Sequence, residues 1–247
     1  MALDIQEVDY LRERLEPKPT DFYYLSLSDL YLALNCAGSD EEVDLLDYGC
    51  GGSPYQGLFP NARYKRADFL KADDDSLDYA LGEDSLVSEK DESFDIILST
   101  QVAEHLPYPQ KYFKECYRLL RREGRLICTT HGYFQDHGCP YDFQRWTSAG
   151  LRRDLQDAGF NVEKVYKLTT GSRAFFSVLD FSFSALNLPR SSVVGMLMFI
   201  GKKGFSFFRT TLYRQLDTLK PHERMALDDE NKHTFYMGLM ALGSKKK

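Results

Sequence analysis

The sequence predicts an α/β domain built on a mostly parallel sheet with helices on both faces. Short apolar runs alternate along the chain with stretches of helical periodicity, and the joints between them are short. A glycine cluster follows the first apolar run. Strands and helices that alternate in this way are typical of a parallel sheet covered on both sides.

The expected elements follow one another in a regular order. The runs expected as strands are residues 43–48, 64–67, 94–99, 125–130, 160–168 and 233–242. The stretches expected as helices are residues 22–36, 109–122 and 148–158. Asp21 and Thr147 are placed to cap the first and the third helix, and Gly124 is placed to stop the second.

Composition limits the partners and the location. The net charge is −6, with the acidic residues concentrated in residues 1–100 and a basic excess in residues 190–247, which disfavours a nucleic-acid substrate. The cysteines are odd in number and lack a C-x-x-C pair; they are Cys36, Cys50, Cys116, Cys128 and Cys139. Reduced thiols, together with charged first residues unlike a signal peptide, lead us to expect a cytoplasmic protein.

The segment from Leu45 to Tyr55 carries the strongest functional signal. Asp47 ends the first apolar run, and Gly49 and Gly51 lie in the turn that follows. Glycine lets the backbone turn sharply and approach a ligand closely. Because ligands of open α/β sheets bind beyond the carboxyl ends of the strands, we expect this turn to border a ligand site.

The same segment separates two cofactor classes. The nicotinamide dinucleotide pattern G-x-G-x-x-G needs a third glycine where this chain has Pro54. With Asp47, Gly49 and Gly51, the chain instead resembles the class I S-adenosylmethionine-dependent methyltransferases, in particular bacterial ones that act on small molecules or saccharides. Residues 91–106 and 119–130 resemble the later motifs of that family in the expected order. The resemblance covers roughly residues 40–170 and the final strand.

The resemblance implies a Rossmann-like sheet of seven strands and S-adenosyl-L-methionine as cofactor. Asp68 matches the acid that binds the ribose hydroxyls, and Asp84 stands where the family has an acid beside the adenine. Thr100 and Gln101 would lie next to the methionine end. The full expected cofactor site is Asp47, Gly49, Gly51, Asp68, Asp84, Thr100 and Gln101. Asp68 as an ordinary cap and Gln101 as a partner of loop backbone remain open alternatives.

Three histidines are the candidate catalytic residues: His131 first, then His105 and His137. Methyl transfer needs alignment above all, and it needs a base where the acceptor is a hydroxyl or a protonated amine. Histidine accepts a proton near neutral pH, and residues 131–146 add aromatic and polar groups suited to a sugar or a ring-bearing acceptor. Structural roles for His105 and His131 stay open. A metal site with Glu104 is an alternative, but Gln101 replaces an expected acid, so we expect no metal.

We expect one domain over residues 1–247. Its parts are an N-terminal helical extension (1–40), a cofactor-binding core (41–170), a helical insertion (171–230), and the last strand with a basic tail (231–247). The apolar stretches of the insertion are shorter than the about 20 residues that span a bilayer. We interpret the insertion first as a lid or a homodimer contact. A peripheral contact with an anionic membrane surface is the alternative.

The sequence thus predicts a methyltransferase that transfers a methyl group from S-adenosyl-L-methionine to a small-molecule or saccharide-type acceptor, at oxygen. One alternative is a catalytically silent, cofactor-binding partner subunit, which would not need the histidines and aromatics of residues 131–146. A further alternative is an NAD-dependent oxidoreductase.

Overall fold

One sheet organises the computed structural model, which describes residues 5–69, 77–137, 141–185, 189, 191–228 and 234–245. Within these residues the sheet has eight strands in the order β3-β2-β1-β4-β5-β8-β6-β7. The strands are β1 Asp44–Tyr48, β2 Arg63–Phe69, β3 Tyr79–Leu81, β4 Phe94–Thr100, β5 Leu120–His131, β6 Asn161–Thr170, β7 Met225–Leu227 and β8 Tyr236–Ser244. Strands β1 to β5 pair in parallel, whereas β8 is antiparallel to β5 and β6.

The α/β class and the mostly parallel sheet are confirmed, with one strand more than the seven expected. Two strands are absent from the six runs expected as strands, and they form the two edges of the sheet. Strand β3 pairs in parallel with β2. Strand β7 lies inside the predicted helical insertion and pairs antiparallel with β6. The predicted last strand corresponds to β8, and His233 lies outside the described residues.

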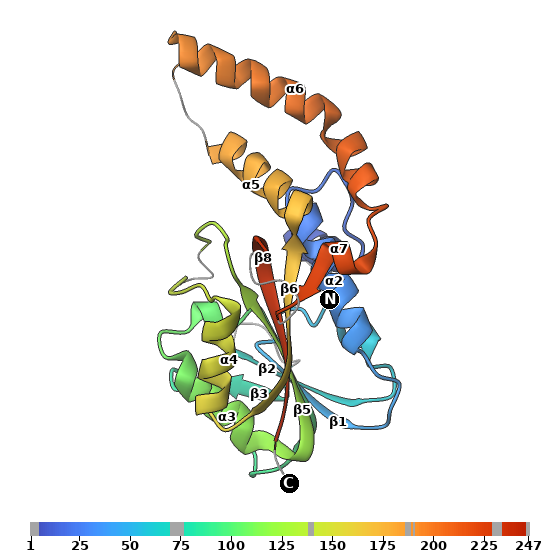
Figure 1. Ribbon diagram of the computed structural model, residues 1–247. Coiled ribbons are helices and arrows are strands. Elements are labelled where there is room, and N and C mark those ends of the chain that lie inside the picture. The colour runs from blue at the N-terminus through green and yellow to red at the C-terminus, as the bar shows by residue number, and fades with distance from the viewer. Residues whose placement is uncertain are drawn as a thin grey trace.

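Helices cover both faces of the sheet (Figure 1). They are α1 Ile5–Leu15, α2 Tyr24–Ala37, α3 Pro109–Leu119, α4 Ser148–Asp157, α5 Gly171–Ala185, α6 Val193–Leu216 and α7 Pro221–Arg224, with 3-10 turns η1 Gln56–Leu58 and η2 Ala103–His105. Because successive strand residues point to opposite faces, Leu46 and Ile97 pack with the α3 and α4 side, whereas Leu45 and Ile96 pack with the α2 side.

The start of α2 corrects one sequence expectation. Its N-cap is Tyr23 rather than Asp21. The Asp21 carboxylate instead accepts two hydrogen bonds from Arg12 on α1, at 2.8 and 3.0 Å. The Asp21 side chain therefore pairs with Arg12, which the fold brings close to it, and does not cap α2.

The end of α3 corrects a second expectation, whereas the start of α4 confirms one. Helix α3 ends at Leu119, well before Gly124, because the Leu119 carbonyl accepts a hydrogen bond from the Ser93 amide (2.9 Å) and the next residue enters β5. Thr147 caps α4 as predicted, since its hydroxyl accepts a hydrogen bond from the Gly150 amide at 3.1 Å.

Helices α5 and α6 form a hairpin that projects beyond the sheet from the end of β6 (Figure 1). Its base is held by Arg173, a fully buried side chain that donates to Asp29 on α2 (2.8 Å) and to Asp217 (3.0 Å). Arg224 donates to the other Asp29 oxygen at 2.6 Å. A buried charge is tolerated only when it is paired, so this network fixes the base of the hairpin on the core.

The helices and the cysteines of the described residues bear on two of the expectations. No described helix has the combination of length and apolar character that crossing a membrane requires. Among the described cysteines, Cys36, Cys50, Cys116 and Cys128 are free thiols. Cys139 lies outside the described residues.

Candidate active site

The turn after β1 has the backbone shape that its glycines predict. Gly49 and Gly51 have φ angles of +81° and +51°, which a residue with a Cβ adopts only under strain. The Gly49 amide donates to the carbonyl of Ala67 on β2 at 2.8 Å. A Cβ on Gly49 would overlap Val102, which follows β4. The turn is therefore packed tightly between the ends of β2 and β4.

Asp47 is buried at the end of β1 with half of its carboxylate unsatisfied. One oxygen accepts a hydrogen bond from the Tyr64 hydroxyl at 2.6 Å, and Oδ1 meets no hydrogen-bond donor among the described residues. Burial raises the pKa of the Asp47 carboxyl to about 7. Buried polar atoms are rarely left unpaired unless a ligand or water completes them, so Oδ1 fits a site that accepts a hydrogen-bond donor from a bound cofactor.

Asp68, at the end of β2, closes the glycine turn from the other side. Its Oδ2 accepts a hydrogen bond from the Gly51 amide at 2.6 Å, and its Oδ1 accepts one from the Phe69 amide at 2.7 Å. Each carboxylate oxygen keeps a further lone pair, so hydroxyl donors can still be bound. Asp84 is exposed in the turn after β3, where its Oδ1 accepts from the Leu86 amide at 3.2 Å.

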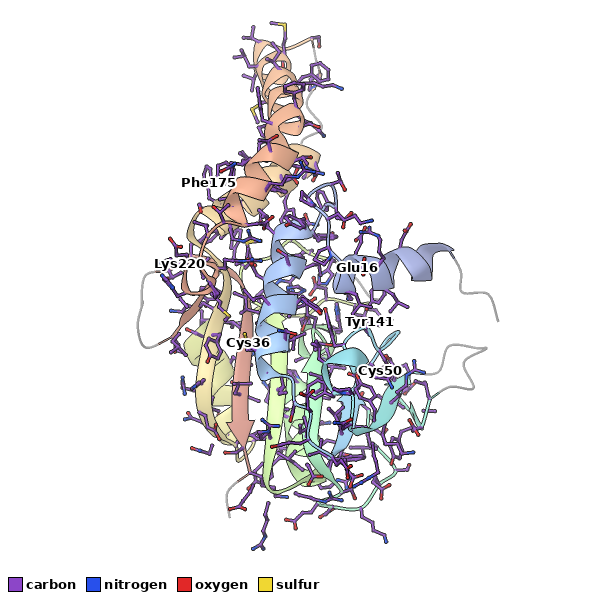
Figure 2. The ribbon with its side chains drawn as sticks, turned by 90° about the vertical axis from the view of Figure 1, so that its right-hand side faces the viewer. Glu16, Cys36, Cys50, Tyr141, Phe175 and Lys220 are labelled. Carbon is purple, nitrogen blue, oxygen red and sulfur yellow. The ribbon has the colours of Figure 1, made fainter. Side chains whose placement is uncertain are left out.

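Helix α1 lies over the glycine turn. A Cβ on Gly51 would come within 3.2 Å of the Tyr10 hydroxyl, and a Cβ on Gly52 within 2.8 Å of a methyl of Leu11. Figure 2 shows the end of α1, marked by Glu16, above the loop that carries Cys50. The N-terminal helix thus forms one wall beside the turn, a contact made across a long stretch of sequence.

The three candidate histidines gather in one cluster at the ends of β4 and β5. The His131 and His137 rings have centroids 4.7 Å apart, and those of His105 and His137 are 5.0 Å apart. Phe134 stacks on the His131 ring at 4.1 Å. The His105 ring also contacts the carbonyl oxygen of Tyr141 at 2.6 Å. The loops that carry these residues therefore converge on His131.

Glu104 is the buried partner of His131. Its side chain is fully buried, with Oε1 3.3 Å from Nε2 of His131 and Oε2 accepting a hydrogen bond from the Thr130 hydroxyl at 2.8 Å. Burial raises the pKa of Glu104 to about 7, and burial together with His137 lowers the pKa of His131 well below its ordinary value. His131 is therefore neutral near neutral pH.

A second ion pair holds the loop that carries His137. Arg145 donates to both oxygens of Asp142, and hydrogen bonding to Arg145 lowers the pKa of Asp142 strongly. The His137 amide donates to Asp142 at 2.8 Å. Burial, followed by the charge of His105, lowers the pKa of His137. The Asp142 carboxylate thus holds the loop through both the Arg145 side chain and the His137 backbone.

A narrow cleft opens beside the histidine cluster. Its empty volume is about 270 Å³, part of it open to solvent. Its lining residues are Ser26, Leu30, Gln101, Thr129, Thr130, His131, Phe134, Leu168, Thr169, Met237, Gly238 and Leu239. Gln101 and Thr169 take positive φ angles of +55° and +53° where β4 and β6 end. Non-glycine residues held in this region are uncommon and concentrate at functional sites.

The structure arranges the predicted residues in two groups that share one bridge. Asp47, Gly49, Gly51 and Asp68 surround the glycine turn, and the three histidines surround the cleft. The segment from Thr100 to His105 joins them, because Val102 contacts Gly49 while Gln101 lines the cleft. Asp84 is exposed in the turn that follows β3, the edge strand next to β2. The cofactor and catalytic roles of all these residues remain predictions.

The partners of several site residues were not predicted from the sequence. Tyr64 reaches Asp47 only because β1 and β2 pair in parallel. Phe134, one of the aromatic residues noted in residues 131–146, stacks on His131. Glu104 had a signal, its place beside His105, but its partner proved to be His131. Among the described residues, no group of three or more His, Cys, Asp and Glu side chains is arranged to hold a metal ion.

A parallel sheet, a glycine turn with a buried acid, and a cleft at the carboxyl edge are features with which Rossmann-like folds hold nucleotide-type cofactors. Residues 46–128 match a family model described as "Methyltransferase domain". This match, together with the fold, supports a class I S-adenosylmethionine-dependent methyltransferase domain over these residues, with S-adenosyl-L-methionine as its cofactor.

Individual relatives agree with this class over limited lengths. The chain is 33% identical over 105 residues to a "Ubiquinone biosynthesis O-methyltransferase" of Maricaulis maris (strain MCS10), which is 36% of this chain and 41% of that protein. The chain thus spans about two fifths of the length of this curated relative.

Solved structures agree in fold. A SAM-dependent methyltransferase from Archaeoglobus fulgidus has a TM-score of 0.53 at 12% identity, covering 96% of this chain and 99% of its own. A phosphoethanolamine N-methyltransferase 2 of Haemonchus contortus, solved with phosphomonomethylethanolamine and S-adenosylhomocysteine, has a TM-score of 0.52 at 12% identity. The match covers 98% of this chain and 57% of that one.

Proposed function

We propose that the protein methylates a small-molecule or saccharide-type acceptor at a hydroxyl oxygen, with His131 as the base. The observation that carries the proposal is the neutral, buried His131 beside the cleft, with its Nε2 3.3 Å from Glu104 Oε1 and its ring stacked on Phe134. A hydroxyl acceptor must lose its proton as its oxygen gains the methyl group, and a neutral histidine that lines the cleft has a ring nitrogen available for that proton. The O-methyltransferase relative supports the choice of oxygen.

The cofactor supplies an electrophilic methyl group on a sulfonium, and the chain supplies its placement. Asp47 and Asp68 would hold its polar donors at the glycine turn, and Gln101 would border the reacting end. With the cofactor bound, the cleft would place an acceptor hydroxyl beside His131, which would take up the hydroxyl proton as the oxygen is methylated. Because Nε2 of His131 faces Glu104, we assign proton acceptance to Nδ1. Glu104 then orients the ring and stabilises its protonated form.

We also propose a cytoplasmic location, supported by the free thiols of the described cysteines. No nucleic-acid partner belongs to the proposal, because the acidic first part of the chain repels polyanions.

The test uses S-adenosyl-L-methionine with a deuterated methyl group and a panel of phenols and monosaccharides. Mass spectrometry should find a product with the methyl group on oxygen. His131→Asn should lower kcat about 100-fold or more, the range of general base catalysis, while the Kd of S-adenosyl-L-methionine stays unchanged. His222→Asn, on an exposed turn of α7, is the matched control. Full activity of His131→Asn, or a product methylated on nitrogen, would contradict the proposal.

A further inference from the structure

One side of α6 presents a continuous apolar surface to solvent. The α6 stripe consists of six side chains that are each at least half exposed: Val193, Met196, Leu197, Ile200, Phe207 and Phe208. With 3.6 residues per turn these positions share one side of the helix, over a length of about 22 Å. Isolated exposed apolar residues are ordinary, but a contiguous row of this kind marks a contact surface.

The opposite side of α6 packs against the protein. Tyr213 and Leu216 are buried with Tyr24 and Leu25 of α2. Nearer the tip, a Cβ on Gly201 would contact the ring of Phe183 on α5 at 3.6 Å. The hairpin therefore holds the stripe outward, on a projection beyond the sheet (Figure 1). In Figure 2, Phe175 marks the lower part of this projection.

The charged side chains at the surface of this hairpin are positive. The sequence of α6 contains neither Asp nor Glu, and about halfway along the stripe the exposed Lys203 flanks it, with the exposed Lys202 as its neighbour in sequence on the far side of the helix. The one acid of α5, Asp180, accepts hydrogen bonds from Arg209 (2.9 Å) and Tyr213 (3.0 Å). The acid is therefore neutralised within the hairpin, and the outer surface is apolar and cationic.

We propose that the α6 stripe docks on a bilayer surface that contains anionic lipids, with α6 lying in the plane of the headgroups. A row of apolar side chains is removed from water when it enters the boundary between headgroups and acyl chains, which is energetically favourable. Adjacent lysines are attracted by anionic headgroups. A second copy of the chain is a poorer occupant. A two-fold pairing of the stripes would bring the lysines of both copies together, without an acid on α6 to compensate them.

The experiment is co-sedimentation of the full chain with two kinds of vesicle. One is pure phosphatidylcholine, and the other is a mixture of phosphatidylcholine and phosphatidylglycerol. We expect the wild-type chain to bind the mixed vesicles and to bind the neutral vesicles weakly. Lys202→Gln with Lys203→Gln should weaken binding to the mixed vesicles about 30-fold, the effect of two lysines near an anionic surface. Lys111→Gln with Lys114→Gln, exposed on α3, is the matched control.

A second pair of variants tests the apolar part. Phe207→Ser with Phe208→Ser should weaken vesicle binding about tenfold or more, whereas Leu86→Ser, exposed on the body of the protein, should leave binding unchanged. Both variants remove solvent-exposed side chains, and unchanged circular dichroism would show that they fold. Equal binding to the two vesicles, or wild-type binding by Phe207→Ser with Phe208→Ser, would overturn the proposal. A dimer in ultracentrifugation that this variant dissociates, without vesicle binding, would assign the stripe to a second copy.

Discussion

The substitution Gly49→Ala should damage the fold and the cofactor site together. Gly49 has a φ angle of +81°, and an added Cβ would overlap Cγ2 of Val102 and lie 2.9 Å from its Cγ1. A left-handed backbone costs a residue with a Cβ about 1–2 kcal/mol, and overpacking costs about 1–3 kcal/mol. We therefore expect the free energy of unfolding to fall by about 2–5 kcal/mol.

Urea unfolding and calorimetric titration with S-adenosyl-L-methionine would measure both effects. Gly57→Ala is the matched control, because a Cβ at Gly57 would meet no atom within 4 Å. Val102→Ala in the Gly49→Ala background should recover part of the loss, since the two side chains would no longer overlap. The reasoning is refuted if Gly49→Ala unfolds at the urea concentration of Gly57→Ala and binds the cofactor as the wild type does.

Three further predictions follow from buried charges. Cofactor binding should weaken about tenfold from about pH 8 to about pH 6, because the pKa of Asp47 is about 7 and only its ionised form accepts two donors. Calorimetry should find that the cofactor affinity of Asp47→Asn depends less on pH. The free energy of unfolding should fall as pH rises from about 4.5 to about 7, because Glu104 in the folded protein keeps a proton that Glu104 in the unfolded chain has lost. Glu104→Gln should reduce this dependence of the free energy of unfolding on pH. An unchanged dependence would exclude Glu104 as its source. Arg173→Met should cost up to about 3–5 kcal/mol in urea unfolding, because it removes one of the two arginines that pair with the fully buried Asp29. Asp29→Leu in the same chain should restore part of that loss.

The sequence predicted those features whose cause is local. Apolar runs followed by glycines specify strands that end in tight turns, and Gly49 and Gly51 take the positive φ angles that only glycine adopts freely. Thr147 caps α4 because an N-cap needs only its own hydroxyl and an amide three residues on. Ser53 shows the limit, because it also has a positive φ, +52°, with no signal in its residue type.

The features that escaped prediction depend on contacts between distant parts of the chain. The buried pair of Arg173 and Asp29 joins residues 144 positions apart, and no spacing rule connects them. Tyr10 lies against the glycine turn only because α1 folds back over it. The three histidines could be placed at one edge of the sheet from the order of the strands, but the link between Glu104 and His131 required the fold. Local signals therefore located the site, and tertiary packing determined its partners.

The most direct test of the account is a crystal structure of the protein grown with S-adenosylhomocysteine. We expect its nucleoside beside Gly49 and Gly51, with Asp68 at the ribose hydroxyls and the sulfur facing the cleft of His131. Density for the ligand elsewhere on the protein, or a complex in which the glycine turn makes no contact with it, would contradict the assignment of this site.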